Sequence, residues 1–127
     1  MKPLRYVILG AGGISNFHVG EYNKQPDVTV VGFLDIDTDT LKRWKGRFPQ
    51  AEVHTNVRRL LGKTRPNFAS VCTPNHVHCS LTLDALAAGC HVMCEKPMAM
   101  TLDQAESMER ARRSRGGLQF CRPIRRG

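Results

Sequence analysis

The hydrophobic residues of this chain fall into short runs separated by longer segments of mixed polarity. Apolar, β-branched runs that predict strands occupy residues 4–9, 28–35, 51–55, 66–74 and 90–97, with a further short candidate at 118–121. Most of these runs are continuous rather than alternating with polar residues. Continuous apolar strands are typical of a sheet that is covered on both faces.

The segments between these runs have the features of helices. Helices are predicted at residues 14–24, 37–48, 56–62, 75–89 and 101–117. Asp and Thr side chains supply N-cap oxygens to the second helix, and Gly89 fits the C-cap of the fourth. Most strands are therefore joined through helices, which requires right-handed crossovers and a parallel sheet. The pattern predicts an α/β fold with a doubly wound parallel sheet.

The charge is distributed unevenly along the 127 residues. Seven arginines and no acidic residues lie between Arg110 and Gly127, and the rest of the chain is nearly neutral. The net charge of +8 therefore belongs to the C-terminal end. Since the length fits one core, we predict a single domain at residues 1–120 followed by a basic tail at 121–127.

The composition limits the cellular setting. No apolar run approaches the roughly 20 residues of a membrane span, and the first strand leads into glycines rather than a cleavage site. The five cysteines sit in apolar stretches, and their odd number favours reduced, mostly buried thiols. We therefore expect a cytoplasmic protein without a membrane partner.

Three glycines follow the first strand directly. The run Gly10-Ala11-Gly12-Gly13-Ile14-Ser15 fits the pattern G-x-G-x-x-small between a strand and a helix. In that pattern the first glycine permits a tight turn, and the second lets a pyrophosphate approach the backbone. The small sixth residue lets the helix pack closely on the sheet. The helix N-terminus then points its N–H groups at the phosphates.

Asp35 ends the second strand, 25 residues after Gly10. This is near the spacing at which a carboxylate reaches the adenosine ribose of a dinucleotide. Asp35 would repel a 2′-phosphate, which favours NAD over NADP, although Lys42 and Arg43 keep NADP as an alternative. The other interpretation is that Asp35 and Asp37 only cap the next helix.

Two further motifs follow the fourth and fifth predicted strands: CTPNHVH at residues 72–78 and CEKPMA at residues 94–99. Together with the glycine motif, in this order, they make the chain resemble the Gfo/Idh/MocA oxidoreductases. The resemblance implies a Rossmann domain that binds a nicotinamide dinucleotide. All three motifs fall at the carboxyl edge of the sheet, where ligands of such folds bind.

The resemblance also implies roles for individual residues. It makes the segment Cys72, Thr73, Pro74 and Asn75 a turn beneath the cofactor, with His78 as the histidine of that motif. It assigns Glu95, Lys96 and Pro97 to the cofactor site, and Lys96 is the catalytic candidate. An ammonium beside the substrate oxygen stabilises a developing alkoxide, and a lysine with a lowered pKa can also transfer the proton.

Other interpretations of the motifs carry less support from the sequence. His76, His78, Cys79, Cys90, His91 and Cys94 invite a zinc site, but they lack a closed four-ligand spacing, and we expect no metal. His18 is interpreted as a packing or surface residue, and Trp44 and Phe48 as the core face of their helix. The arginine-rich end lacks interleaved aromatics beyond Phe120, so we expect no nucleic-acid partner.

The family implied by the resemblance has a second α/β domain that contacts the substrate, and this chain is interpreted as a truncated form without it. Two functions remain open. The first is the cofactor-binding half of an oxidoreductase acting on a sugar or polyol hydroxyl, which needs a second domain or chain to complete its site. The second is a dinucleotide-binding module or remnant without turnover. A lone domain would also expose an apolar surface, so self-association is expected.

Overall fold

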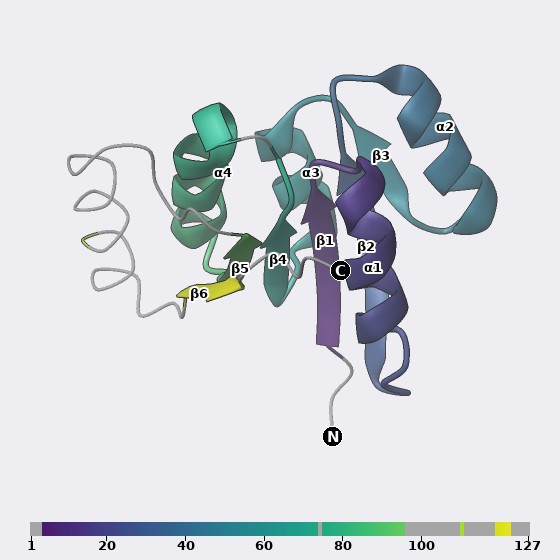
Figure 1. The fold of residues 1–127 in the computed structure, drawn as a ribbon, viewed down its shortest axis with the longest axis horizontal. Coiled ribbons are helices and arrows are strands. Elements are labelled where there is room, and N and C mark those ends of the chain that lie inside the picture. Colours follow the sequence, from purple (N-terminus) through teal and green to yellow (C-terminus); the bar gives the residue numbers. More distant parts are fainter. Residues whose placement is uncertain (1–3, 74, 96–109, 111–118, 123–127) are drawn as a thin grey trace.

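One parallel sheet organises the part of the chain that the computed structural model describes, residues 4–73, 75–95, 110 and 119–122 (Figure 1). Its strands are β1 (Leu4–Leu9), β2 (Val28–Leu34), β3 (Glu52–His54), β4 (Phe68–Val71), β5 (His91–Glu95) and β6 (Gln119–Arg122). They lie in the order β3-β2-β1-β4-β5-β6, and every neighbouring pair is parallel. The sequence order therefore reverses between β1 and β4.

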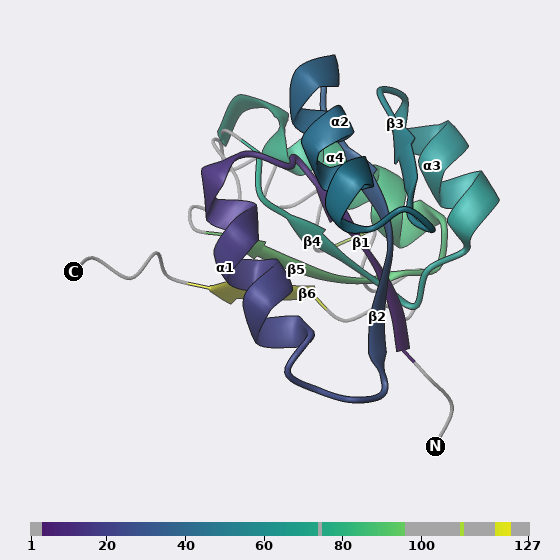
Figure 2. The same cartoon turned by 90° about the vertical axis from the view of Figure 1, so that its right-hand side faces the viewer.

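Helices cover both faces of this sheet (Figures 1 and 2). They are α1 (Gly13–Tyr22), α2 (Thr38–Arg47), α3 (Val57–Thr64) and α4 (Asn75–Ala87). Residues of α1 and α2 join one hydrophobic cluster and residues of α3 and α4 join the other. The predicted doubly wound α/β fold is thus confirmed.

The central strand β1 contributes to both clusters because successive side chains of a strand point to opposite faces. Tyr6 and Ile8 pack with α1 and α2, whereas Val7 and Leu9 pack with α3 and α4. All four side chains are completely buried. This burial explains why the strand reads as a continuous apolar run.

The boundaries of several elements differ from those predicted. The fourth strand covers only Phe68–Val71 of the predicted 66–74, because prolines flank that segment and cannot donate to a strand ladder. The third helix is shifted to Val57–Thr64, with the Asn56 side chain as its N-cap. The predicted helix at 101–117 lies outside the described residues except for Arg110. The sixth strand runs to Arg122, while the domain division at residue 120 stays a prediction.

Two of the cysteines lie in the core, as expected from their apolar surroundings. Cys79 and Cys90 are buried, and Cys72 is half-buried. Burial raises the pKa of the Cys90 thiol to about 11, because the interior disfavours the thiolate. Separately, none of the helices in the described ranges is long and apolar enough to cross a membrane.

Gly32 of β2 gives a test of how tightly the sheet packs on α3. A Cβ at this position would lie 2.6 Å from Leu60 Cδ1 and 3.2 Å from Val7 Cγ1. We therefore expect Gly32→Ala to reduce the free energy of unfolding by about 1–3 kcal/mol through overpacking. Chemical denaturation measures the change.

Gly62 provides the matched control, since it lies in α3 with open space around its Cα. There the same substitution should stabilise the protein by up to about 1 kcal/mol, because alanine is the better helix former. Equal effects at the two positions would contradict the close packing of β2 against α3.

Candidate functional site

A cleft opens at the carboxyl edge of the sheet, where the chain leaves β1 for α1 on one face and β4 for α4 on the other. Such a reversal of strand order is where open α/β sheets bind ligands. The cavity here has a volume of about 540 Å³. It is lined by Gly10, Gly12, Leu34, Asp35, Ile36, Thr55, Val57, Cys72, Thr73, Val77, Ser80 and Leu81.

Gly10 at the end of β1 is required by the fold itself. Its φ is +95°, a conformation that side-chain-bearing residues rarely adopt. A Cβ here would lie 2.9 Å from the backbone nitrogen of Thr73 and would also collide with the Thr73 methyl group. The ends of β1 and β4 approach this closely because residue 10 has no side chain.

Gly12 and Gly13 have open space where a side chain would be, since a Cβ on either residue would meet no atom within 4 Å. Gly12 is the N-cap of α1 in an extended conformation, with no side chain capping the helix. The packing of the described residues therefore gives no steric reason for these glycines. The open space and the uncapped helix N-terminus together fit an anionic group such as a pyrophosphate.

Ser15 occupies the position predicted for a small residue. It is completely buried, and both its backbone N–H and its hydroxyl donate to the carbonyl oxygen of Gly12. These bonds tie the turn to the first turn of α1, and the small side chain lets α1 lie close to the sheet.

Asp35 and Asp37 have different roles. The Asp35 carboxylate lines the cleft and accepts hydrogen bonds from the Ala11 N–H and the Asp37 N–H, each at 2.9 Å. Asp37 caps α2, where its side chain accepts from the Asp39 N–H at 3.0 Å and the Thr40 hydroxyl at 3.0 Å. These two bonds, that of Thr40 first, lower the pKa of Asp37. Capping therefore accounts for Asp37, whereas Asp35 joins the end of β2 to the glycine turn.

Cys72 and Thr73 also line the cleft, directly after β4. Since β2 and β4 flank β1 on opposite sides, these residues lie across β1 from Asp35. The Thr73 hydroxyl oxygen is buried and has no hydrogen-bond partner among the described residues. An unpartnered buried hydroxyl is costly, so its presence beside the cleft is consistent with a polar ligand at this edge.

The structure brings together only part of the predicted site. Gly10, Gly12, Asp35, Cys72 and Thr73 share the cleft, and Ala11 and Gly13 lie in the same turn. For four predicted residues the structure describes the backbone element alone: Ile14 in α1, Asn75 and His78 in α4, and Glu95 in β5. Pro74, Lys96 and Pro97 lie outside the described residues. The roles of all these residues in binding stay predictions.

Several cleft residues were not identified from the sequence. Ile36, Thr55 and Val57 line the cavity after β2 and β3, and Ile36 is 92% exposed. Ile36 and Thr55 lie one or two residues after a strand end, the same kind of position that identified Asp35, whereas Val57 is the first residue of α3. Val77, Ser80 and Leu81 belong to α4, and they line the cavity because of the way this helix packs on the sheet, which the sequence pattern does not indicate.

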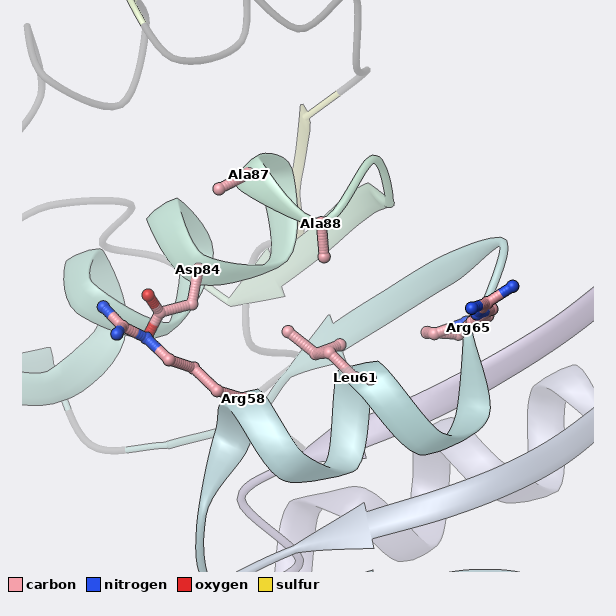
Figure 3. A pocket seen from close by; sticks show the side chains of 8 residues that line it. Arg58, Leu61, Arg65, Asp84, Ala87 and Ala88 are labelled. Carbon is pink, nitrogen blue, oxygen red and sulfur yellow. The ribbon is translucent and has the colours of Figure 1, made fainter.

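A larger cavity of about 660 Å³ lies between α3 and α4 (Figure 3). In Figure 3 the Arg58 side chain extends toward the Asp84 carboxylate, while Leu61, Ala87 and Ala88 give the groove apolar walls. None of its lining residues lines the cleft at the glycine turn. The groove lies between two helices and not at the strand ends.

Metal binding finds no support in the described part of the chain. No three His, Cys, Asp or Glu side chains come together there in an arrangement that could hold an ion. The side chains of His76, His78 and Cys94, which invited the zinc interpretation, lie outside the description.

Comparison with solved structures identifies the class of fold. The chain superposes on the WlbA dehydrogenase from Chromobacterium violaceum, solved with NADH and UDP-GlcNAcA, with a TM-score of 0.90 and 28% identity. That match covers 96% of this chain and 35% of the other. GenD2 from gentamicin A biosynthesis, solved with NAD, matches with a TM-score of 0.88 and 25% identity over 95% of this chain and 34% of its own. The fold is that of a Rossmann domain.

The sequence identifies the family. The model of the GFO_IDH_MocA oxidoreductase family, NAD-binding Rossmann fold, matches residues 4–121, and the chain belongs to this family. It is 39% identical over 108 residues to D-glucoside 3-dehydrogenase of Escherichia coli (strain K12), covering 84% of this chain and 31% of that protein. The chain thus spans about a third of the length of the relatives it matches. The family confirms the predicted resemblance and NAD as its cofactor.

The two glycines at the edge of the cleft should respond differently to alanine. Gly10→Ala should lower the free energy of unfolding by at least about 1–3 kcal/mol, because it combines a positive φ with a steric collision. Gly12→Ala should leave the free energy of unfolding within about 0.5 kcal/mol of the original, since its Cβ enters open space at a φ of −73°. Urea denaturation of both variants checks this, and a destabilised Gly12→Ala would contradict the open space.

Proposed function

We propose that this chain binds NAD(H) in the cleft at the glycine turn and is the cofactor-binding part of an oxidoreductase. The reaction is hydride transfer between the nicotinamide and a sugar or polyol hydroxyl. The observation that carries the proposal is that Gly12, Asp35 and Thr73 meet around one cavity at the reversal of strand order. Membership of the family supports it.

The chain's own groups suit the parts of the dinucleotide. The amides at the start of α1 would hold the pyrophosphate in the open space beside Gly12 and Gly13. Asp35 would hold the adenosine ribose. Its carboxylate accepts two backbone bonds, and since a carboxylate offers about four lone-pair sites, it retains capacity for ribose hydroxyls.

The same region favours NAD over NADP. A 2′-phosphate on the ribose would meet the Asp35 carboxylate, with the Asp37 carboxylate two residues away. Lys42 and Arg43 are the basic residues that kept NADP as an alternative, and the Arg43 guanidinium donates to the Thr40 hydroxyl at 3.2 Å. It also lowers the pKa of Asp37, although less than the Thr40 and Asp39 hydrogen bonds do. Arg43 thus interacts with residues at the start of α2, and it also lines the small cavity beside the glycine turn. The preference for NAD therefore rests on Asp35 at the end of β2.

The catalytic step is proposed on the resemblance of the CEKP segment. The cofactor supplies a nicotinamide ring that accepts or donates hydride. Lys96 would stabilise the developing alkoxide as an ammonium, or accept the hydroxyl proton as a neutral amine. Cys72, Thr73, Pro74 and Asn75 would support the cofactor from below, with His78 as the histidine of the same motif. Glu95 and Pro97 would lie at the nicotinamide end.

The substrate part of the site is proposed to come from a second domain or chain. This chain covers 31% of D-glucoside 3-dehydrogenase and 35% of the WlbA dehydrogenase, so most of each relative has no counterpart here. The alternative function is a dinucleotide-binding module without turnover.

Binding of the cofactor can be measured directly by titrating the chain with NADH and following nicotinamide fluorescence. We expect saturable binding, with NADPH at least about tenfold weaker because of the Asp35 charge. Asp35→Ala should weaken NADH binding by roughly 10- to 100-fold, since it removes charge-assisted hydrogen bonds. Gly12→Val should weaken it at least as much by filling the pyrophosphate space.

The matched control is Asp84→Ala, which removes a carboxylate from the groove between α3 and α4. It should bind NADH as the original chain does. A folded chain that does not bind NADH, or one whose binding Asp35→Ala leaves unchanged, would exclude the proposed site.

Catalysis is tested by following NADH formation with NAD and a sugar or polyol such as glucose or inositol. If the chain turns over, Lys96→Gln should lower the rate by about 10²- to 10⁴-fold, the usual contribution of acid–base catalysis. Turnover unaffected by Lys96→Gln would remove this residue from the mechanism. Saturable binding without turnover on any polyol would favour the binding module.

A further inference from the structure

Trp44 of α2 reaches the centre of the glycine turn. Its indole N–H donates to the carbonyl oxygen of Ala11 at 2.9 Å in a buried hydrogen bond. We propose that Trp44 is a positioning residue of the dinucleotide site, which holds the glycine turn in the conformation that receives the pyrophosphate. This inference rests on the proposed function for its ligand, but the geometry of the turn is its own evidence.

The hydrogen bond controls the direction of the peptide group that follows Ala11. A peptide unit is planar and trans, so its C=O and N–H point in opposite directions. When the Ala11 oxygen faces α2, the Gly12 N–H necessarily points away from α2. The Ala11 N–H is held independently by Asp35 at 2.9 Å. Both peptide groups of Ala11 are therefore held by side chains from the second strand–helix unit.

Trp44 is itself rigidly placed. Its ring stacks on that of Phe33 in β2, with the ring centroids 4.6 Å apart. The guanidinium of Arg47, also in α2, lies over the Trp44 ring at 4.5 Å from its centroid. Arg47 also donates to the Asn16 side-chain oxygen at 2.9 Å, and the Asn16 amide donates to the Gly13 carbonyl at 3.3 Å. These contacts connect α2 to the first turn of α1. An indole fixed in this way provides a stable donor for the turn.

Ala11 packs in the same hydrophobic cluster as Leu41 and Trp44 of α2, but open space borders the rest of the turn. A cavity of about 270 Å³ lies beside it, lined by Ala11, Gly12, Gly13, Asn16, Thr40, Arg43, Trp44 and Arg47. The turn therefore has room to shift on this side. An indole N–H can only donate, and this one is buried, so losing the Ala11 oxygen would leave it without an acceptor. The N–H, and not only the bulk of the ring, is the part of Trp44 that matters.

The chain contains one tryptophan, so this residue can be replaced uniformly by analogues during synthesis. The test variant carries β-(3-benzothienyl)alanine, which keeps the shape of indole but has sulfur in place of N–H. The matched control carries 5-fluorotryptophan, which keeps the N–H. A second pair uses natural residues, with Trp44→Phe as the test variant and Phe48→Leu as its control. The Phe48 ring stacks near Trp44, but a phenyl side chain cannot donate a hydrogen bond to the turn.

Two quantities are measured on each protein. The first is hydrogen–deuterium exchange of the Ala11 and Ser15 amides without cofactor, because their hydrogen bonds depend on the shape of the turn. The second is the dissociation constant for NADH. We expect the benzothienyl protein to exchange these two amides at least about tenfold faster and to bind NADH about tenfold more weakly. The fluorotryptophan protein and Phe48→Leu should match the original chain in both.

The outcomes separate this inference from the proposed function. If all the proteins, the original included, fail to bind NADH, the proposed function fails and the inference is tested by the exchange rates alone. Faster exchange limited to the amides of the turn then supports a positioning role for Trp44. Unchanged exchange overturns it. If the original chain binds NADH and the benzothienyl protein binds equally well, Trp44 does not position the site. Faster exchange across the whole sheet would also overturn the inference, because it would show a general loss of stability.

Discussion

The burial of β1 on both faces is the constraint on which the rest of the structure depends. Its alternate side chains complete two separate hydrophobic clusters, so α1 and α2 must cover one face while α3 and α4 cover the other. The chain then has to leave β1 and its neighbour β4 toward opposite faces. A cleft at the carboxyl ends of these two strands is the geometric consequence.

Two glycines at this edge serve different ends, although they look alike in the sequence. Gly10 lets β1 and β4 end side by side, because its positive φ and the nearness of Thr73 exclude a side chain. Gly12 has open space around it and contributes nothing to the packing of the described residues. Gly10 is thus required for folding, whereas Gly12, in the proposed function, leaves room for the ligand.

The glycine turn is also supported from outside its own strand and helix. Asp35 binds the Ala11 N–H and Trp44 binds the Ala11 oxygen, and these partners lie 24 and 33 residues further along the chain. A site for a dinucleotide is therefore built by two consecutive strand–helix units. Preorganisation of this kind reduces the ordering cost of binding, because the backbone donors are already placed.

The sequence by itself determined the class of fold, the order of its elements and the position of the glycine turn, since these depend on local periodicity and on the backbone freedom of glycine. It also identified Asp35 and Thr73 as residues at strand ends. It left open whether Asp35, like Asp37, only caps the next helix, and it assigned Trp44 to the core face of its helix alone. Those distinctions depend on contacts between segments far apart in the chain. Only the tertiary structure decided them, because hydrogen bonds across a packed interface leave no periodic pattern in the sequence.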